Sequence, residues 1–390
     1  MAESYLDRAR AAAQLLTSRW FTEGLVDQWV PNQDYWKAPT IAQELVAHMA
    51  LAGSTDYRAL VDYVRQAGEW YLASCGYLDD ATVWGRAHVT TYDWITATGG
   101  SGADDYLRDA NTVFDGLTPT WDDRCGGGLY WMRPGTGNDA GNFKAMNATL
   151  GLMEIGLGLH RITGRADRLE WAQRAWKWIQ GSGLIDAEGM VWGGYTPECV
   201  RDDRNIPVVA LQGNPLTPLW WMYQATGDAA LLDLAERIVD GTLRAFVWPG
   251  TQTLATPFDG GWAGADADWR LAHQNDAMFK GVFCGFLGPF TANLATVAGR
   301  EDAAARYAAF LRANADALAA NFPGGVFGMD WHTPDPGYAG DPDPGNDAVL
   351  QYSGLAALDA AAAVEHLAAG TGTGGPSAAP AASPVPGDTP

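Results

Sequence analysis

Basic residues are scarce in this chain, and their scarcity excludes several kinds of partner. The 390 residues contain 25 Lys and Arg against 46 Asp and Glu, so the formal net charge is −21. Nucleic acids and anionic membrane surfaces attract basic proteins, so neither is an expected partner, and acidic substrates are disfavoured as well. Two charge-free runs approach the length of a membrane span, but prolines interrupt both, so no span is expected.

Cysteine and histidine are also few, with four and six residues respectively. The cysteines show no Cys-x-x-Cys spacing, so neither a zinc site nor a thioredoxin-like motif is indicated. Cys284 falls in a charge-free helix and is expected to be a small core residue. Cys75, Cys125 and Cys199 fall in long loops, where one pair could close as a disulfide. No metal or other cofactor is expected.

Recognisable targeting signals are absent at the start of the chain, which has no basic segment followed by an apolar core. We therefore expect a cytoplasmic location for the chain as given, and an extracytoplasmic one if an export segment is missing. At the other end, residues 370–390 are dense in Gly, Pro, Ala and Ser without apolar periodicity. This composition predicts a disordered tail.

What the chain does contain is a repeated helical hairpin with a glycine at its joint. The helices after the joints mix charged and apolar residues at helical spacing, as outer helices do, whereas residues 206–227 and 281–299, before two of the joints, carry no charge at all. Pairing the N-terminal helix with the last helix, near residues 347–369, completes six hairpins. The sequence thus predicts one all-α domain over residues 1–369, an (α/α)6 toroid. The joint glycines are Gly53, Gly99, Gly164, Gly227 and Gly299.

A closed toroid places its long connections on one face, where we expect the functional site. These connections are rich in tryptophan and carboxylates, for example Trp36, Trp121-Asp122-Asp123 and Trp131. Indole rings stack on the C–H faces of sugar rings, and carboxylates accept hydrogen bonds from sugar hydroxyls. The connections therefore favour a polyol ligand, although each tryptophan could instead pack a loop onto the barrel.

The adjacent carboxylates Asp79 and Asp80 stand where such a loop gives way to a helix. Like charges held close together push one pKa upward, so one carboxyl tends to be protonated while the other is anionic. Glycoside hydrolysis uses this division between a general acid and a second carboxylate. Helix capping is the alternative reading, since Asp is common at helix starts and further pairs occur, such as Asp104-Asp105.

Several strings together resemble glycoside hydrolase family 76, the endo-α-1,6-mannanase family, over about residues 5–366. They are Tyr77-Leu78-Asp79-Asp80 with Trp84, the segment from Trp121 to Trp131, Gly183-Leu184-Ile185-Asp186, Gln212-Gly213, and Phe279-Lys280-Gly281. The resemblance implies the same toroid and a retaining mechanism, with Asp79 as nucleophile and Asp80 as general acid/base. Together with the loop composition, it indicates substrate contacts at Trp36, Trp84, Asp122, Asp123, Trp131, Gln212 and Lys280.

The chain departs from the family pattern at three places. Ala145 follows Lys144 where an Asn is expected, Leu211 precedes Gln212 where another Asn is expected, and Val83 replaces a Trp before Trp84. These departures bear on the cleaved linkage and on substrate preference more than on the reaction type.

The expected function is thus a retaining, endo-acting hydrolase of α-1,6-mannan or a related mannose-containing glycan, acting as a monomer. A transglycosidase or a non-hydrolytic mannan-binding protein would use the same loops. A sugar epimerase, which is disfavoured, would need histidines for proton abstraction, and His88 and His273 are those nearest the predicted site.

Overall fold

The computed structural model describes residues 3–21, 36–69, 75–136, 142–203, 207–257, 259, 273–333 and 344–368. The predicted tail, 370–390, lies outside the described residues.

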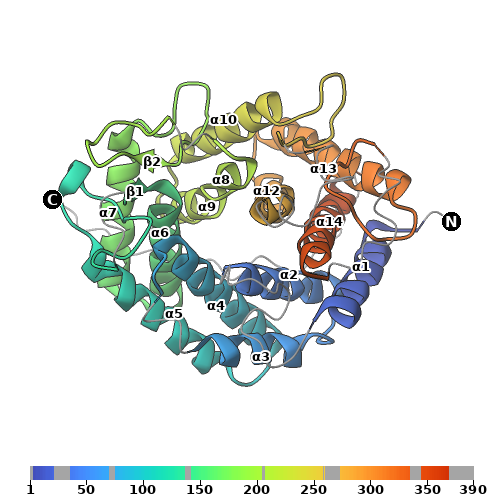
Figure 1. Cartoon of the computed structure of the whole chain (residues 1–390), viewed down its shortest axis with the longest axis horizontal. Coiled ribbons are helices and arrows are strands. Elements are labelled where there is room, and N and C mark those ends of the chain that lie inside the picture. The colour runs from blue at the N-terminus through green and yellow to red at the C-terminus, as the bar shows by residue number, and fades with distance from the viewer. Residues whose placement is uncertain are drawn as a thin grey trace.

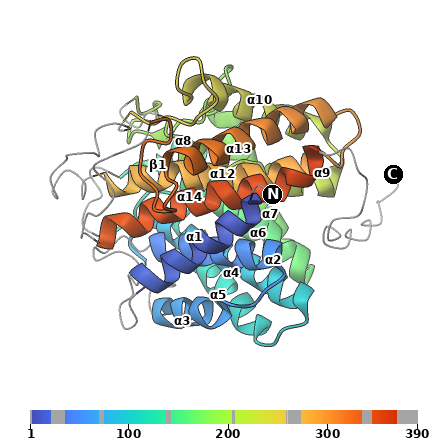
Figure 2. The ribbon, with the colours of Figure 1, turned by 90° about the vertical axis from the view of Figure 1, so that its right-hand side faces the viewer.

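The described helices form two concentric rings (Figure 1), and they run side by side along the ring axis (Figure 2). The inner ring comprises α2 (Lys37–Ala52), α4 (Leu78–Thr98), α6 (Met146–Thr163), α8 (Val209–Gly213) with α9 (Leu216–Thr226), α12 (Gln274–Leu294) and α14 (Pro344–Val364). The outer ring comprises α1 (Tyr5–Trp20), α3 (Arg58–Gly68), α5 (Ala103–Leu117), α7 (Ala166–Ser182), α10 (Ala229–Ala245) and α13 (Glu301–Asn321). The predicted (α/α)6 toroid is confirmed.

Four of the five joint glycines end their inner helices as predicted. The fifth, Gly299, has a positive φ of 83°, but it lies beyond the end of α12, whose last residue is Leu294 and whose C-cap is Ala295. Gly53, Gly99, Gly164 and Gly227 all take the left-handed conformation at a helix C-cap, and the N–H of each donates to a carbonyl of the last turn. This conformation suits glycine because it has no Cβ to clash. One inner helix differs from the expectation: the charge-free run 206–227 is divided into α8 and α9, because Pro215 has no N–H to continue the helical hydrogen bonds.

The ring closes through α14, which packs against α12, α1 and α2. Gly281 and Gly288, two turns apart on α12, allow this close approach, since a Cβ at Gly281 would lie 2.5 Å from Cα of Ser353 and one at Gly288 would lie 2.8 Å from Cα of Ala360. The helices are therefore held by packing of small residues as well as by burial of larger ones. Among the described helices none is long and apolar enough to cross a membrane.

A cluster of buried ionisable side chains lies inside the inner ring. Glu44 of α2 hydrogen-bonds Asp359 of α14, and Nδ1 of His48 lies 2.9 Å from Oδ1 of Asp359. Burial raises the pKa of Glu44 well above its usual value, and the nearby Asp359 carboxylate adds to the effect. Burial also raises the pKa of Asp359 and lowers that of His48. We infer that the two carboxyl groups share a proton in the folded protein.

This shared proton makes stability depend on pH. A raised pKa in the folded state contributes stability that is complete below the pKa of the unfolded chain and is lost as pH rises through the folded value. The Glu44→Gln variant keeps a donor for Asp359 but has no proton to lose. The wild type should lose this contribution as pH rises and the variant should not. We therefore expect the difference in free energy of unfolding between Glu44→Gln and the wild type to change in favour of the variant from about pH 5 to about pH 9, measured by chemical denaturation.

The matched control for this prediction is Glu170→Gln, which removes the same charge from an exposed position on α7. Its stability should follow the wild type across the same range. An unchanged difference between Glu44→Gln and the wild type at both ends of the range would contradict the shared proton.

Candidate functional site

The functional site is built on a set of short backbone pairings between loops on one face of the toroid. The N–H of Leu78 donates to the carbonyl of Trp131, at 2.8 Å, and the N–H of Trp131 donates to the carbonyl of Phe143, at 2.9 Å. Strand β1 (Lys144–Ala145) then pairs antiparallel with β2 (Gly194–Tyr195). Three loops far apart in the sequence are thereby joined beside the start of α4.

These pairings align three aromatic side chains along one wall. The ring centroids of Tyr77 and Trp131 lie 5.1 Å apart, and those of Trp131 and Phe143 lie 5.4 Å apart with an interplanar angle of 26°. All three rings line a cavity of about 750 Å³ that also contains Asp79 and Asp80. Such a wall offers flat apolar faces to a ligand.

The cavity is lined by residues of several inner helices and of the loops above them. They are Trp36, Tyr77, Asp79, Asp80, Thr82, Val83, Arg86, Trp131, Phe143, Asn147, Gly193, Val208, Ala210, Leu211, Asn214, Asn275, Phe279 and Val282. Of the residues predicted from the sequence, Asp79, Asp80, Trp36 and Trp131 are brought together here. No histidine lines the cavity within the described ranges, and no three potential metal-ligating side chains are grouped there or elsewhere in those ranges.

Asp79 lies in the first turn of α4, where the helix dipole favours an anion. Its Oδ2 accepts a 2.8 Å hydrogen bond from Nδ2 of Asn147, while Oδ1 is buried and has no partner in hydrogen-bond geometry among the described residues. Burial raises the pKa of Asp79 to about 6, and the hydrogen bond from Asn147 opposes that rise. Asp79 therefore changes its protonation state near neutral pH, as groups at catalytic sites often do.

Sequence reasoning did not assign a role to Asn147, although it opens an inner helix one turn after the lysine of the family pattern. Tyr77, Phe143 and Arg86 were also missed. Arg86 follows Asp79 by seven residues, and this spacing places both side chains on one face of α4. The spacing is the only local feature of the sequence that points to Arg86 as a site residue.

Three of the predicted substrate contacts lie away from the cavity. Trp84 is buried and faces outward from α4, since its ring occupies the space that a Cβ at Gly68 of α3 would need. Gln212 is fully buried and binds the backbone of Val191 through both ends of its amide, at 2.8 and 3.0 Å. Nζ of Lys280 lies 2.6 Å from the Asp259 carboxylate. The geometry gives these residues a part in holding loops.

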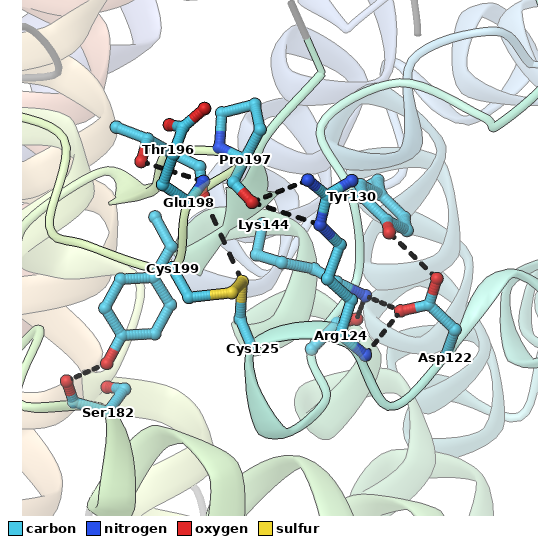
Figure 3. Close-up of a disulfide and its surroundings, with 12 residues drawn as sticks. Asp122, Arg124, Cys125, Tyr130, Lys144, Ser182, Thr196, Pro197, Glu198 and Cys199 are labelled. Atoms are coloured by element: carbon cyan, nitrogen blue, oxygen red, sulfur yellow. Dashed lines mark hydrogen bonds and ion pairs between the residues drawn. A yellow bond between two sulfur atoms is a disulfide. The ribbon is translucent and has the colours of Figure 1, made fainter. Parts of the chain in front are cut away.

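Asp122 and Asp123 also lie outside the cavity lining. The carboxylate of Asp122 accepts hydrogen bonds from Nζ of Lys144, at 2.6 Å, and from the hydroxyl of Tyr130, at 2.8 Å, as Figure 3 shows. The side chain of Asp123 is 97% exposed and lies 3.5 Å from Arg174. That either aspartate contacts a ligand stays a prediction.

A disulfide between Cys125 and Cys199 joins the loop after α5 to the loop after β2 (Figure 3). It spans 74 residues of sequence, and the guanidinium of Arg124 reinforces it with hydrogen bonds of 2.6 and 3.1 Å to the carbonyl of Pro197. One pair among the three loop cysteines is thus closed, as the sequence allowed, and Cys284 is buried as expected. Both bridged cysteines have left-handed backbones, with φ of 53° and 61°.

The toroid with paired aspartates in a cavity on its long-loop face has the architecture of a known class of solved structures. The chain matches an inactive variant of the α-1,6-mannanase GH76A of Salegentibacter sp. HEL1_6, in complex with α-1,6-mannotriose, with 18% identity, a TM-score of 0.74 and coverage of 92% of this chain and 99% of that one. It also matches Dfg5 from Chaetomium thermophilum in complex with glucosamine, with 21% identity, a TM-score of 0.74 and coverage of 93% and 90%.

The sequence assigns the chain to a family. The family model of glycosyl hydrolase family 76 matches residues 4–369, so the chain belongs to that family and the resemblance seen in its motifs is confirmed. A relative is the mannan endo-1,6-alpha-mannosidase DCW1 of Eremothecium gossypii, 25% identical over 315 residues. That match covers 76% of this chain, which spans 66% of the length of the relative.

The role of Asn147 can be tested by removing its amide. In Asn147→Ala the anionic form of Asp79 loses a hydrogen bond, so the pKa of Asp79 should rise further above its value of about 6. Carboxyl ¹³C NMR titration of the variant and the wild type measures this directly. Asn293→Ala, in the last turn of α12 and so at the opposite end of the barrel from the long loops, is the control and should leave the titration unchanged. A pKa that falls or does not move in Asn147→Ala would contradict the assignment.

The disulfide gives a second test. Replacing both Cys125 and Cys199 with serine should lower the free energy of unfolding by about 4 kcal/mol, the chain-entropy value for a loop of this length. Reductant should lower the stability of the wild type to that of the variant and leave the variant unaffected. The double glycine variant should be about 1 kcal/mol more stable than the double serine variant, because glycine relieves the left-handed backbone. Equal stability of oxidised and reduced wild type would refute the bridge.

Proposed function

We propose that this protein is a retaining, endo-acting glycoside hydrolase that cleaves α-1,6-linked mannan or a related mannose-containing glycan. The observation that carries the proposal is the Asp79-Asp80 pair in a cavity with an aromatic wall, in a chain of glycosyl hydrolase family 76. The names of the relatives support the substrate: α-1,6-mannotriose is bound to the Salegentibacter enzyme, and the Eremothecium protein is named for α-1,6-mannan.

Substrate binding would begin at the wall of the cavity. The faces of Tyr77, Trp131 and Phe143 suit the C–H faces of pyranose rings, and Trp36 lies on the lining as well. Trp131 and Phe143 stack on each other and Tyr77 is tilted against Trp131, so the rings form one continuous apolar surface beside the carboxylates, in a cavity of about 750 Å³ that has room for more than one sugar unit. This arrangement fits an oligosaccharide segment better than a single free sugar.

The reaction we propose is a double displacement. Asp79 attacks the anomeric carbon of a mannosyl unit, and Asp80 donates a proton to the departing glycosidic oxygen. Asp80 then takes a proton from water, which attacks the anomeric carbon, breaks its bond to Asp79 and frees the product with its configuration retained. Asn147 stabilises the anionic nucleophile before attack.

The assignment of the two roles follows the order of the aspartates in the family motif. The pKa of Asp79, about 6, means that this carboxyl is anionic only above that pH in the ligand-free cavity. Activity should therefore fall as pH drops through this value. The roles themselves are best decided by chemistry, because the pKa of one carboxyl group does not by itself assign the roles of two.

The alternatives considered from the sequence give different products on the same glycan. A transglycosidase would form longer oligosaccharides, and a non-hydrolytic protein would bind mannan without releasing reducing ends. An epimerase would need a base beside the sugar, and His88 lies instead between Trp84 and Tyr106, outside the cavity, where burial lowers its pKa to about 4. Hydrolysis is the reading that the cavity supports best.

We also propose that the protein works outside the cytoplasm. Cys199, one of the two bridged cysteines, is exposed at the surface, where cytosolic reductants would reach the disulfide. Structural disulfides persist mainly in oxidising compartments. Recovery of the protein from its native cells with both of these cysteines reduced would argue against this location.

The hydrolase proposal is tested with unbranched α-1,6-mannan. The wild type should release reducing ends as α-configured mannooligosaccharides, followed by NMR of the first products, and Asp79→Asn and Asp80→Asn should each lower the rate by at least about 1,000-fold. Asp104→Asn, at the exposed member of the aspartate pair that opens α5, is the matched control and should keep the wild-type rate. Wild-type protein that binds the glycan without releasing ends would overturn the proposal.

Azide separates the two roles on a mannosyl substrate with an activated leaving group. In Asp79→Ala, azide should occupy the space of the nucleophile and give β-mannosyl azide. In Asp80→Ala, azide should instead attack the glycosyl-enzyme intermediate and give α-mannosyl azide. The reverse pattern would exchange the roles of the two aspartates.

A further inference from the structure

The cavity continues past the two catalytic aspartates into the barrel. On α4 the lining residues Asp79 and Arg86 are seven positions apart, and on α12 Asn275 and Val282 have the same separation. Seven residues are two helical turns, about 10 Å along a helix axis. Because inner helices begin at the long-loop face, Arg86 and Val282 lie about two turns below the rim.

Arg86 belongs to this deep layer and lacks the partners that a buried arginine normally has. It is 8% exposed. Its nearest charged group is Glu154 of α6, at 3.7 Å, which is too long for a hydrogen bond, and its guanidinium lies 5.3 Å from the Phe286 ring. Nε is buried without an acceptor among the described residues. A guanidinium carries five N–H donors, and buried donors are nearly always satisfied.

Asn214 adds a second polar group near Arg86, because its neighbour Gly213 packs against the same Phe286 ring: a Cβ at Gly213 would lie 3.0 Å from Cδ2 of Phe286. Asn214 follows α8, where Pro215 divides the inner helix, and its side chain lines the cavity while being 9% exposed. Its amide makes no hydrogen bond to any side chain or backbone group of the described residues. The break in this helix thus turns an amide with both donor and acceptor capacity toward the cavity.

We propose that Arg86 and Asn214 form a deep subsite that binds hydroxyl groups of a neutral pyranose unit, next to the unit that reacts at Asp79 and Asp80. The subsite rests on the proposed function, because it presumes a glycan in the cavity. The planar fork of a guanidinium reaches two oxygen atoms at once, as neighbouring hydroxyls of a sugar offer. The apolar side chain of Val282, which lines the same cavity one turn before Phe286 on α12, suits the C–H face of the ring.

The charges around the subsite favour a neutral sugar over one that carries phosphate or carboxylate. Glu154 lies 3.7 Å from Arg86 and, above its pKa of about 7, compensates part of the positive charge of Arg86. Asp79 and Asp80 line the same cavity, and the chain as a whole has a net charge of −21. An anionic substituent on the sugar would be attracted by one cation, Arg86, but would lie near three carboxyl groups, which oppose its binding.

The test measures binding in a background that cannot turn over substrate, Asp79→Asn with Asp80→Asn, using α-1,6-mannooligosaccharides and analogues with single hydroxyls removed. Arg86→Met, which keeps the length of the side chain without its donors, should weaken binding on the order of 10- to 100-fold by calorimetry. Asn214→Ala should weaken it by a smaller factor. The deoxygenated analogue that lacks the contacted hydroxyl should bind equally well with and without Arg86→Met.

Arg168→Met is the matched control, since Arg168 is also buried, at 2% exposed, but lies between outer helices, where it binds Asp115 and Asn111. It should not change the affinity. If Arg86→Met does not fold cooperatively, Arg86→Gln, which keeps donors on a shorter side chain, takes its place in the same cycle. Equal losses for the complete and the deoxygenated ligands would mean a structural role for Arg86 and would overturn the subsite.

The outcomes also separate this inference from the proposed function. Wild-type cleavage of α-1,6-mannan with unchanged binding in Arg86→Met overturns the subsite alone. If the wild type cleaves a different neutral glycan, the proposed substrate falls, and the same cycle on that glycan decides the subsite. Binding of a phosphorylated or uronate-bearing oligosaccharide that depends on Arg86, while neutral ligands do not, overturns the assignment to a neutral sugar.

Discussion

The site depends on buried polar side chains of the inner helices that bind the backbone of the long connections. The hydroxyl of Thr149 on α6 accepts a hydrogen bond from the N–H of Leu129. The side-chain amide of Gln212 on α8 hydrogen-bonds both the N–H and the carbonyl of Val191. Lys280 of α12 binds the carbonyl of Met329. A loop folded over a barrel needs partners for its buried N–H and carbonyl groups, and the barrel supplies them from below. The loops on this face are therefore fixed by the same helices that form the cavity, which places the aromatic wall next to Asp79 and Asp80.

This arrangement explains why the fold could be predicted from the sequence and the site only in part. Helical periodicity and glycine at a joint such as Gly99 are local signals, so the six hairpins and their order follow from short windows of sequence. The Asp79-Asp80 pair was also found locally, because it opens a helix. Trp84 and Gln212 belong to recognisable strings, but a string does not distinguish a residue that contacts a ligand from one that holds a loop in place. Asn147 reaches Asp79 across 68 positions of sequence, and no local pattern reports such a contact.

The electrostatics of the pair arise from two opposing features of the same position. The first turn of α4 offers backbone N–H groups and the positive end of the helix dipole, both of which stabilise a carboxylate. Burial in the cavity acts in the opposite direction and dominates at Asp79, whose pKa is raised to about 6. The hydrogen bond from Asn147 stabilises the anionic form of Asp79 and so offsets part of the effect of burial. A carboxyl group tuned in this way can be anionic at neutral pH and remain poorly solvated, and a poorly solvated carboxylate is more reactive toward an anomeric carbon.

The toroidal fold also determines which part of the molecule can hold buried polar side chains. Its apolar core occupies the ring between inner and outer helices, as the outward-facing Trp84 illustrates, so the interior of the inner ring is free to carry polar side chains. Groups such as Arg86, Glu154 and Glu44 lie there at a cost to stability, because each needs a partner or a proton. Burial raises the pKa of Glu154 to about 7, so the pair that it forms with Arg86 is weakest in acid. A ligand with hydroxyl groups would supply the missing hydrogen bonds, and part of the cost of burying these groups would then be recovered on binding.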